Sequence, residues 1–287
     1  GSKMLIAQIT DSHIEAAGVL AYGTFDSAAS LTRIVKELNA RDPQPDLILH
    51  TGDMAHHGSP EQYGPLMELV KPLKAPFFAI PGNHDSREGF RQAFAGTDWL
   101  PKTGEFIHYT IDDFPVRLIC LDTVVPGVPY GMLCGERLAW LKNALAAAPD
   151  KPTIVACHHP PFATGLTGST KVGLDQGGAE FAALLAENPQ VQRLICGHVH
   201  RPISAVFGGR AAWASPATCY QFEAGMSAEQ TLALTNEPPG YSLHAWVDDP
   251  VAGPNLASHF VPVGDFGDPI ILMRKGERVG PLLNAGH

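Results

Sequence analysis

The stretch Phe77-Phe-Ala-Ile-Pro-Gly-Asn-His-Asp85 decides how this chain is interpreted. Its four apolar residues predict a short buried strand, after which Pro81 and Gly82 turn the chain into a polar cluster. In open α/β sheets the ligand site lies beyond the carboxyl ends of the strands, so this cluster is placed where function is expected. A Pro-Gly turn can also be purely structural, so companion clusters are needed to decide between the two interpretations.

Four other predicted strands end in the same kind of polar cluster. The clusters are Asp11-Ser-His13, Gly52-Asp53, His158-His159 and Gly197-His-Val-His200. Each alone has a structural alternative as a turn, a helix cap or a buried histidine. Five such strand ends in one chain converge in space, which favours a single functional site.

The converging side chains are carboxylates, imidazoles and an amide, without a thiolate. They are Asp11, His13, Asp53, Asn83, His84, His158, His198 and His200. Nitrogen and oxygen donors of this kind suit Zn, Fe, Mn or Co. Their number exceeds the demand of one ion, so we expect two ions about 3.5–4 Å apart, bridged by a carboxylate, as in phosphate-ester hydrolysis. Alternate residues leaving a strand point the same way, which predicts that Asp11 and His13 reach one ion. Gly52 and Gly82 are expected to allow unusual backbone angles.

Strand and helix patterns alternate along most of the chain, which predicts the α/β class. Predicted strands cover 4–10, Leu47–His50, 77–80, 106–111, 116–121, 153–157 and Val191–Cys196, followed by a hairpin of Ile203–Phe207 and Arg210–Ala214. Predicted helices cover Ser27–Ala40, 61–73, 86–95, 135–148 and 177–188. Beyond Cys219 the pattern weakens into Pro/Gly-rich sequence with weak strands such as 241–247 and 258–263.

The composition of the 287 residues argues against several other classes. Twenty basic and 29 acidic residues give a net charge of −9, and there is no Lys/Arg run, so neither a nucleic-acid polymer nor a membrane is an expected partner. Apolar runs stay far below the ~18–20 residues of a membrane-spanning helix. Five cysteines without CxxC spacing predict free thiols and a cytoplasmic setting. Residues 1–3, which begin Gly-Ser, are expected to be an expression scar and the start of the chain.

The ordered motifs resemble those of the calcineurin-like metallophosphoesterases. That family's pattern of D-x-H, GD, GNH[DE], a histidine and GH-x-H is filled at every metal-ligand position over about residues 4–216. The resemblance implies a four-layer αββα sandwich of two mixed sheets flanked by helices, in place of one open sheet. The two ligand sets that it implies share a bridging Asp53: Asp11, His13 and His200 complete the first set, and Asn83, His158 and His198 complete the second.

The stretch after the second strand points to one branch of the family. Thr51-Gly-Asp-Met-Ala-His-His-Gly58 lacks the Asp-Arg pair of Ser/Thr protein phosphatases and the tyrosine of purple acid phosphatases. Together with Ala21-Tyr-Gly-Thr-Phe-Asp26, it resembles bacterial class III cyclic-nucleotide phosphodiesterases and glycerophosphodiesterases. That branch implies hydrolysis of a small phosphodiester by in-line attack of metal-bound hydroxide, and a homo-oligomer. Two alternatives stay open, namely a phosphomonoesterase or nucleotide hydrolase with the same two metals, and a non-catalytic metal-binding scaffold.

Individual residues receive roles from the same resemblance. His84 is expected to be catalytic, by stabilising a phosphoryl oxygen or protonating the departing alkoxide. Asp85 is expected either to orient His84 or to cap the following helix. His56 stands where the branch commonly has Asp or Asn. It is expected to contact the substrate or the surroundings of the second metal, or else to be an exposed residue at the pocket rim. The substrate-contact set is Asn83, His84, His56, Tyr22 and Phe25, with the 162–168 loop as a further wall. We expect residues 4–216 to be the catalytic domain and 217–287 an extension that caps the pocket or pairs subunits.

Overall fold

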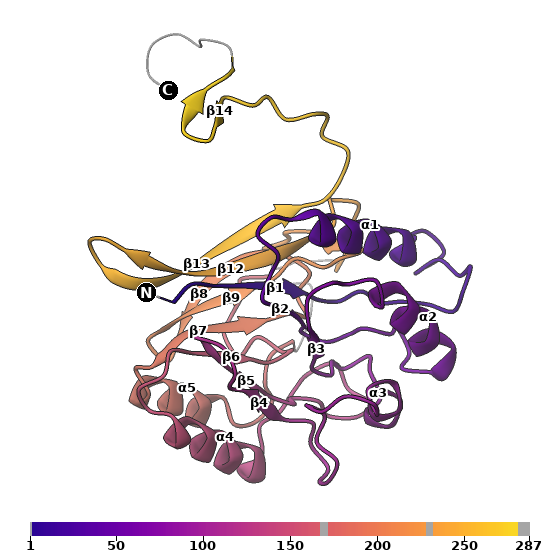
Figure 1. Cartoon of the computed structure of the whole chain (residues 1–287). Helices are drawn as coiled ribbons and strands as arrows, with labels where there is room; N and C mark the ends of the chain where they lie inside the picture. The colour runs from indigo at the N-terminus through magenta and orange to yellow at the C-terminus, as the bar shows by residue number, and fades with distance from the viewer. Residues whose placement is uncertain (1, 167–171, 228–231, 281–287) are drawn as a thin grey trace.

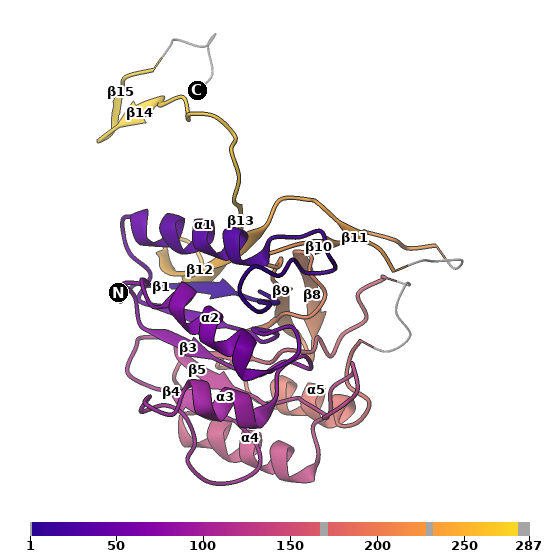
Figure 2. The same cartoon turned by 90° about the vertical axis from the view of Figure 1, so that its right-hand side faces the viewer.

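Two β-sheets packed face to face form the centre of the protein, and helices cover both outer faces (Figures 1 and 2). The computed structural model describes residues 2–166, 172–227 and 232–280. The sheets have the strand orders β13-β12-β1-β2-β3 and β4-β5-β6-β7-β9-β8. This is the four-layer αββα sandwich that the motifs implied.

The first sheet carries three of the five polar clusters. Its strands are β1 (Met4–Ile9), β2 (Leu47–His50), β3 (Phe77–Ala79), β12 (Gly240–Asp249) and β13 (Gly253–Pro262). Strands β1, β2 and β3 run parallel, whereas β12 and β13 join antiparallel. The helices that pack on this sheet are α1 (Ser27–Ala40), α2 (Pro60–Val70) and α3 (Arg87–Ala93). Helix α1 begins where the Asp26 carboxylate accepts a hydrogen bond from the Ala29 N–H at 3.0 Å, the usual cap of a helix start.

The second sheet carries the other two clusters. Its strands are β4 (Tyr109–Ile111), β5 (Arg117–Cys120), β6 (Thr153–Ala156), β7 (Val191–Cys196), β8 (Ile203–Phe207) and β9 (Arg210–Ala214). The central strands β5, β6, β7 and β9 are parallel, and β4 and β8 close the edges antiparallel. Helices α4 (Gly135–Ala147) and α5 (Gly178–Glu187) cover its outer face. Several predicted elements are shorter than expected. For example, the strand predicted over 106–111 begins at Tyr109, the helix predicted over 61–73 ends at Val70, and the helix predicted over 86–95 spans Arg87–Ala93.

Each central strand is buried on both faces. In β1, Ile6 packs between the sheets while Ala7 and Ile9 pack under the helices. In β6, Ile154 faces the first sheet and Val155 faces α4 and α5. Burial on both sides explains why these strands are unbroken apolar runs rather than alternating patterns.

The segment after residue 216 contributes to the sandwich itself. Strand β12 pairs with β1 from Met4 opposite Trp246 to Gln8 opposite Ser242, and β13 pairs with β12 over ten residues. Residues 240–262 thus complete the first sheet, although they lie beyond the expected division at residue 216. Their pattern is weak because β13 is an edge strand with many exposed positions. Two short ribbons lie outside the two large sheets, one of β10 (Gln221–Phe222) and β11 (Leu234–Thr235), the other of β14 (Met273–Arg274) and β15 (Glu277–Arg278).

The five polar clusters meet where the ends of the two sheets adjoin. Strands β1, β2 and β3 deliver the clusters of the first sheet, and β6 and β7 deliver those of the second. The sheets are tied together at this point, since His158 Nδ1 donates to the Thr51 carbonyl at 2.7 Å. Among the described helices, none has the length and apolar character needed to cross a membrane.

Candidate metal centre

Four of the expected ligand atoms form a first group around one point. His200 Nε2 lies 3.2 Å from Asp11 Oδ1 and 3.1 Å from His13 Nε2. His13 Nε2 also lies 3.6 Å from Asp53 Oδ2. Metal–ligand bonds of about 2.0–2.2 Å place neighbouring ligand atoms roughly 3–3.5 Å apart, so this spacing suits a shared ion.

A second group shares Asp53 with the first. His158 Nε2 lies 3.3 Å from Asp53 Oδ2, 3.1 Å from Asn83 Oδ1 and 3.1 Å from His198 Nδ1. Because His158 Nδ1 donates to a carbonyl, its Nε2 faces two oxygens that offer lone pairs, Asp53 Oδ2 and Asn83 Oδ1, with His198 Nδ1 beside them. Such a convergence of acceptors requires a proton or a cation between them.

Each carboxylate has one oxygen held by the protein and one left for an ion. Asp11 Oδ2 accepts from the Thr10 hydroxyl at 2.6 Å and the His198 N–H at 2.9 Å. Asp11 Oδ1 is buried without a hydrogen-bond partner in the described structure. Asp53 Oδ1 accepts from the His84 N–H at 2.8 Å, which leaves Oδ2 between the two groups. A buried, unpartnered carboxylate oxygen is costly unless a cation sits beside it, so the donor set fits two metal ions.

The backbone holds these ligands in an unusual conformation. Seven described non-glycine residues have a positive φ, and six of them are expected site residues: Asp11, His13, Tyr22, Asp53, His198 and His200. A left-handed backbone costs about 1–2 kcal/mol per residue, so its concentration here marks a functional site. Strand alternation, which we expected to direct Asp11 and His13 to one side, therefore does not set the directions of these two side chains. Strand β1 ends at Ile9, and both side chains are aimed by left-handed turns.

Glycines allow the turns to approach one another. Gly52 has φ +103°, a backbone conformation that glycine adopts readily and other residues rarely adopt, as expected. Gly82 has no such angle, and its role is close packing, because a Cβ there would lie 2.3 Å from Asp53 Oδ1. Gly197 is similar, since a Cβ would lie 2.2 Å from Thr10 Oγ1.

The protonation of the ligands is governed by burial and by their mutual charges. Burial lowers the pKa of His13 to about 4 and that of His198 to about 3. Burial also opposes the charged form of His158, but the carboxylates of Asp53 and Asp11 raise its pKa to about 10. Although burial disfavours ionisation of Asp53, His158 holds the pKa of that carboxyl well below its usual value. In the absence of metal the two carboxylates therefore favour the protonated form of His158, and a bound cation would take the place of that proton.

Comparison with known proteins agrees with this geometry. The profile of the calcineurin-like phosphoesterase family matches residues 4–202 of the chain. The chain belongs to the calcineurin-like phosphoesterase family. Members of this family are metal-dependent hydrolases, and the site of this phosphoesterase is capable of holding two metals.

Curated relatives of this phosphoesterase are named as phosphodiesterases. A protein from Arcobacter nitrofigilis, named probable glycerophosphodiester phosphodiesterase GpdQ, is 34% identical over 277 residues, covering 96% of this chain and all of that protein. The 3',5'-cyclic adenosine monophosphate phosphodiesterase CpdA of Pseudomonas aeruginosa is 34% identical, covering 84% of each chain. A dimetal phosphatase from Danio rerio shares the fold, with a TM-score of 0.63 at 13% identity over 92% of this chain and all of the other.

His84 and Asp85 have different places in the phosphoesterase site. The His84 ring lies against His13, with centroids 4.8 Å apart, and its Nδ1 donates to the His56 carbonyl at 2.8 Å. The expectation that Asp85 orients His84 is corrected, because the carbonyl of His56 takes that position. The alternative role as a helix cap is also wrong, because Ser86 caps α3 through its bond from the Gly89 N–H.

Asp85 instead organises the loop that carries Asp53. Its carboxylate accepts from the Asp53 N–H at 2.8 Å, the Gly82 N–H at 2.9 Å and the Tyr63 hydroxyl at 2.8 Å. The N–H groups of Met54 and Ala55 complete the set at 3.3 and 3.2 Å. Burial and the charge of Asp53 raise the pKa of Asp85. Its role is therefore structural.

The expected substrate residues differ in how far they are exposed to solvent. His56 is 7% exposed, which overturns its interpretation as an exposed rim residue. Tyr22 is 60% exposed, and its ring meets His56 at 5.2 Å and Tyr220 at 5.7 Å, so it stands at the open side of the site. Phe25 packs on Tyr220 at 4.7 Å.

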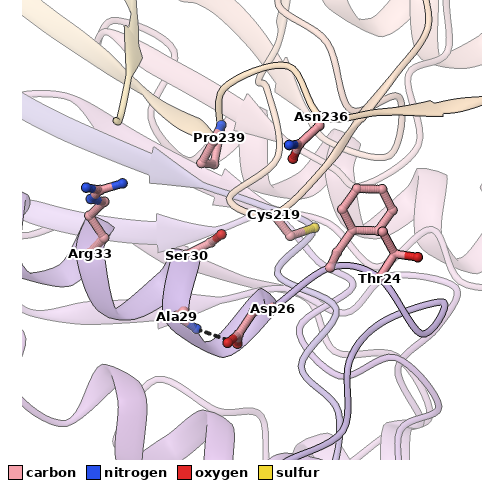
Figure 3. Close-up of a pocket in the computed structure, with 9 residues that line it drawn as sticks. Thr24, Asp26, Ala29, Ser30, Arg33, Cys219, Asn236 and Pro239 are labelled. Atoms are coloured by element: carbon pink, nitrogen blue, oxygen red, sulfur yellow. Dashed lines mark hydrogen bonds between the residues drawn. The ribbon is translucent and has the colours of Figure 1, made fainter. Parts of the chain in front are cut away.

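Phe25 also lines a pocket of about 430 Å³ beside the start of α1. Figure 3 shows this pocket with its other lining residues labelled. Asp26 and Arg33 of the α1 region and Cys219 and Asn236 from the later chain surround it. None of the expected ligands is among the described residues that line it, so this pocket adjoins the metal centre and does not contain it. Of the predicted 162–168 wall, residues 167 and 168 lie outside the described residues.

Several residues that hold the ligands were not found from sequence. Thr10 fixes Asp11, and the Tyr220 carbonyl accepts from His200 Nδ1 at 2.8 Å. The ring of Phe222 stacks on His200 at 4.4 Å. Thr10 could have been suggested by its place beside a ligand. Tyr220 and Phe222 follow no strand signal and reach the site only through the fold.

Proposed function

We propose that this protein is a dinuclear metal-dependent phosphodiesterase of small substrates. The observation that carries the proposal is the pair of ligand groups that share Asp53 Oδ2, 3.6 Å from His13 Nε2 and 3.3 Å from His158 Nε2. Asp11, His13, Asp53 and His200 would hold one ion, and Asp53, Asn83, His158 and His198 the other. Bound divalent ions would supply a hydroxide at neutral pH and neutralise charge on the phosphoryl oxygens.

The chain's own residues prepare the site for that chemistry. Thr51 and Tyr220 carbonyls fix the Nδ1–H tautomers of His158 and His200, which leaves both Nε2 atoms for the ions. Thr10 and the His198 N–H turn one oxygen of Asp11 away from the site, so its other oxygen faces inward. The ligands are therefore oriented before substrate arrives.

His84 is the candidate for proton transfer. Its Nδ1 is committed to the His56 carbonyl, so Nε2 is the nitrogen that can act on substrate. In the protonated form it would give its Nε2 proton to the alkoxide oxygen as the bond from phosphorus to that oxygen breaks. General acid catalysis of this kind contributes about 10²–10⁴-fold.

The substrate class is proposed from the named relatives together with the mouth of the site. Relatives at 34% identity are named for a glycerophosphodiester and for cyclic AMP, both small phosphodiesters. The glycerophosphodiester relative aligns with 96% of this chain, so we propose glycerophosphodiesters as the first substrate to test and cyclic nucleotides as the second. Tyr22, exposed beside His56, is the proposed contact for the leaving group.

The test compares four substrates on one metal-free preparation. Mn²⁺, Co²⁺, Zn²⁺ or Fe²⁺ is added in turn, and turnover is measured with bis(p-nitrophenyl) phosphate and with the p-nitrophenyl monoester. A glycerophosphodiester and cyclic AMP are then compared by kcat/KM. We expect metal-dependent turnover with the diester favoured. Preference for the monoester would support a phosphomonoesterase, and bound metals without turnover of any substrate would support the scaffold alternative.

We further propose a homo-oligomer assembled through the C-terminal arm, residues 264–280. This arm stands away from the sandwich in both views (Figures 1 and 2). Along it, Phe266, Ile270 and Met273 are exposed. Exposed apolar residues on an extended segment favour contact with a second copy. Light scattering of the full chain and of a chain ending at Val263 tests this, and a monomeric full chain would refute it.

We also propose a reducing, cytoplasmic setting, because all five cysteines are free.

A further inference from the structure

His56 lies directly behind the expected ligand His13. The two Nδ1 atoms are 3.0 Å apart, and both side chains are buried. His13 points its other nitrogen, Nε2, at His200, Asp11 and Asp53. One of the two Nδ1 atoms must therefore donate and the other must accept.

The direction of this hydrogen bond follows from counting protons. A neutral imidazole carries one N–H, so a His13 that offers its Nε2 lone pair to an ion carries its proton on Nδ1. His13 Nδ1–H must then donate to His56 Nδ1. The proton of a neutral His56 is consequently on Nε2, and that atom lies 3.9 Å from Glu15 Oε1.

Glu15 is itself held in place. Its Oε2 accepts from Gln62 Nε2 at 2.9 Å, and Gln62 Oε1 accepts from the His57 N–H. Gln62 thus fastens the segment after the first cluster to the loop after the second. This leaves the second oxygen of Glu15 on the side of His56 Nε2–H.

We propose that His56, supported by Glu15, is a positioning residue that fixes the metal-binding tautomer of His13 and so sets the affinity of the first metal site. The inference rests on the proposed function, because it assumes that His13 Nε2 binds an ion. A partner behind a metal-ligating histidine is commonly worth 10–100-fold in metal affinity. His56 would act on one of the two ions, because it contacts His13 and belongs to neither ligand group.

The same residues raise a competing interpretation. Glu15, His56 and His57 offer ligand atoms within 4.8 Å of one another, as a third metal site would. A His56 that accepts from His13 carries its proton on Nε2, so it has no lone pair for that third ion. The two interpretations therefore predict different metal stoichiometries, two ions against three.

The decisive variants either keep or remove the hydrogen-bond acceptor that His56 presents to His13. In His56→Asn, the side-chain oxygen is bonded to Cγ as Nδ1 is in histidine, so an acceptor is retained. His56→Leu removes the acceptor while keeping an apolar side chain of similar bulk. Glu15→Gln removes the charge behind His56. His57→Ala is the matched control, because this neighbouring side chain is exposed, lies beside the His56 ring and belongs to neither ligand group.

Metal binding is measured directly, by titrating metal-free protein with Zn²⁺ against a competing chelator and by elemental analysis. We expect two equivalents for the wild type. His56→Leu should weaken one of them about 10–100-fold and spare the other, while His56→Asn restores most of the affinity. Glu15→Gln should give a smaller loss at the same equivalent, and His57→Ala should change neither.

Unchanged affinities in a folded His56→Leu protein, or equal losses in His56→Leu and His56→Asn, would overturn the positioning role while leaving the proposed function intact. A third equivalent that disappears in His57→Ala would overturn it in favour of a third metal site. A wild-type chain that binds no metal would overturn the proposed function, and with it the premise of this inference.

Discussion

Gly82→Ala is expected to disable the site by displacing Asp53, although it adds a single methyl group. Gly82 has an ordinary φ, so alanine is tolerated by the backbone and the effect is one of space alone. The added Cβ would lie 2.3 Å from Asp53 Oδ1 and 2.4 Å from Asp53 N. Both atoms are engaged, since Oδ1 accepts from the His84 N–H and the Asp53 N–H donates to Asp85.

The magnitude follows from the size of the overlap. Ordinary contacts to such a carbon begin near 3.4 Å, so Asp53 or its partner loop must shift by about 1 Å. The Oδ2 atom of the same carboxylate lies 3.6 Å from His13 Nε2 and 3.3 Å from His158 Nε2. Its displacement therefore disturbs both metal positions. A misplacement of about 1 Å in a catalytic group can cost 10²-fold in rate, and we expect at least that loss in kcat/KM.

The assay pairs turnover of bis(p-nitrophenyl) phosphate with metal content and thermal unfolding. Gly64→Ala is the matched control, because Gly64 lies inside α2 with open space around its Cβ position. It should leave activity unchanged and raise the unfolding free energy by roughly 0.5–1 kcal/mol. A folded Gly82→Ala protein with two ions and near-wild-type turnover would refute the argument that Asp53 is held rigidly against Gly82.

Three other predictions follow from the same contacts. Asp85→Ala should lower the unfolding free energy by several kcal/mol in urea titrations. Four backbone N–H groups and the Tyr63 hydroxyl would lose their acceptor, at a cost of about 1–3 kcal/mol each. Unchanged stability would contradict the structural role of Asp85. His84→Ala should lower kcat about 10²–10⁴-fold with both ions retained by elemental analysis, and loss of an ion would make it a ligand. In the metal-free protein, burial lowers the pKa of His158, but the charges of Asp53 and Asp11 outweigh it and raise that pKa from 6.5 to about 10. The protonated His158 therefore contributes its full stabilisation below pH 6.5, and this stabilisation is lost as the pH rises towards about 10. Urea titrations should show metal-free protein losing stability over that range, and metal-loaded protein losing less because an ion replaces the proton.

The sequence by itself predicted most strands and helices of the sandwich and the set of side chains that meet at the strand ends. Helix Ser27–Ala40 and strand Leu47–His50 have the predicted bounds, because capping and apolar periodicity are local properties. The five clusters were recognisable because each directly follows a strand. Such features can be predicted from sequence because they depend on residues that are neighbours along the chain.

Only the tertiary structure decided how those residues are used. Asp85 stands beside His84 in sequence, but its carboxylate serves the Asp53 loop some 30 positions earlier. His56 turned out to be buried against His13, and β12 turned out to pair with β1 across nearly the whole chain. These contacts join segments whose local sequence patterns do not indicate which other segment they will contact. Their cause is physical: hydrogen bonds and burial across two packed sheets depend on which strand ends adjoin, and that is set only when the whole sandwich forms.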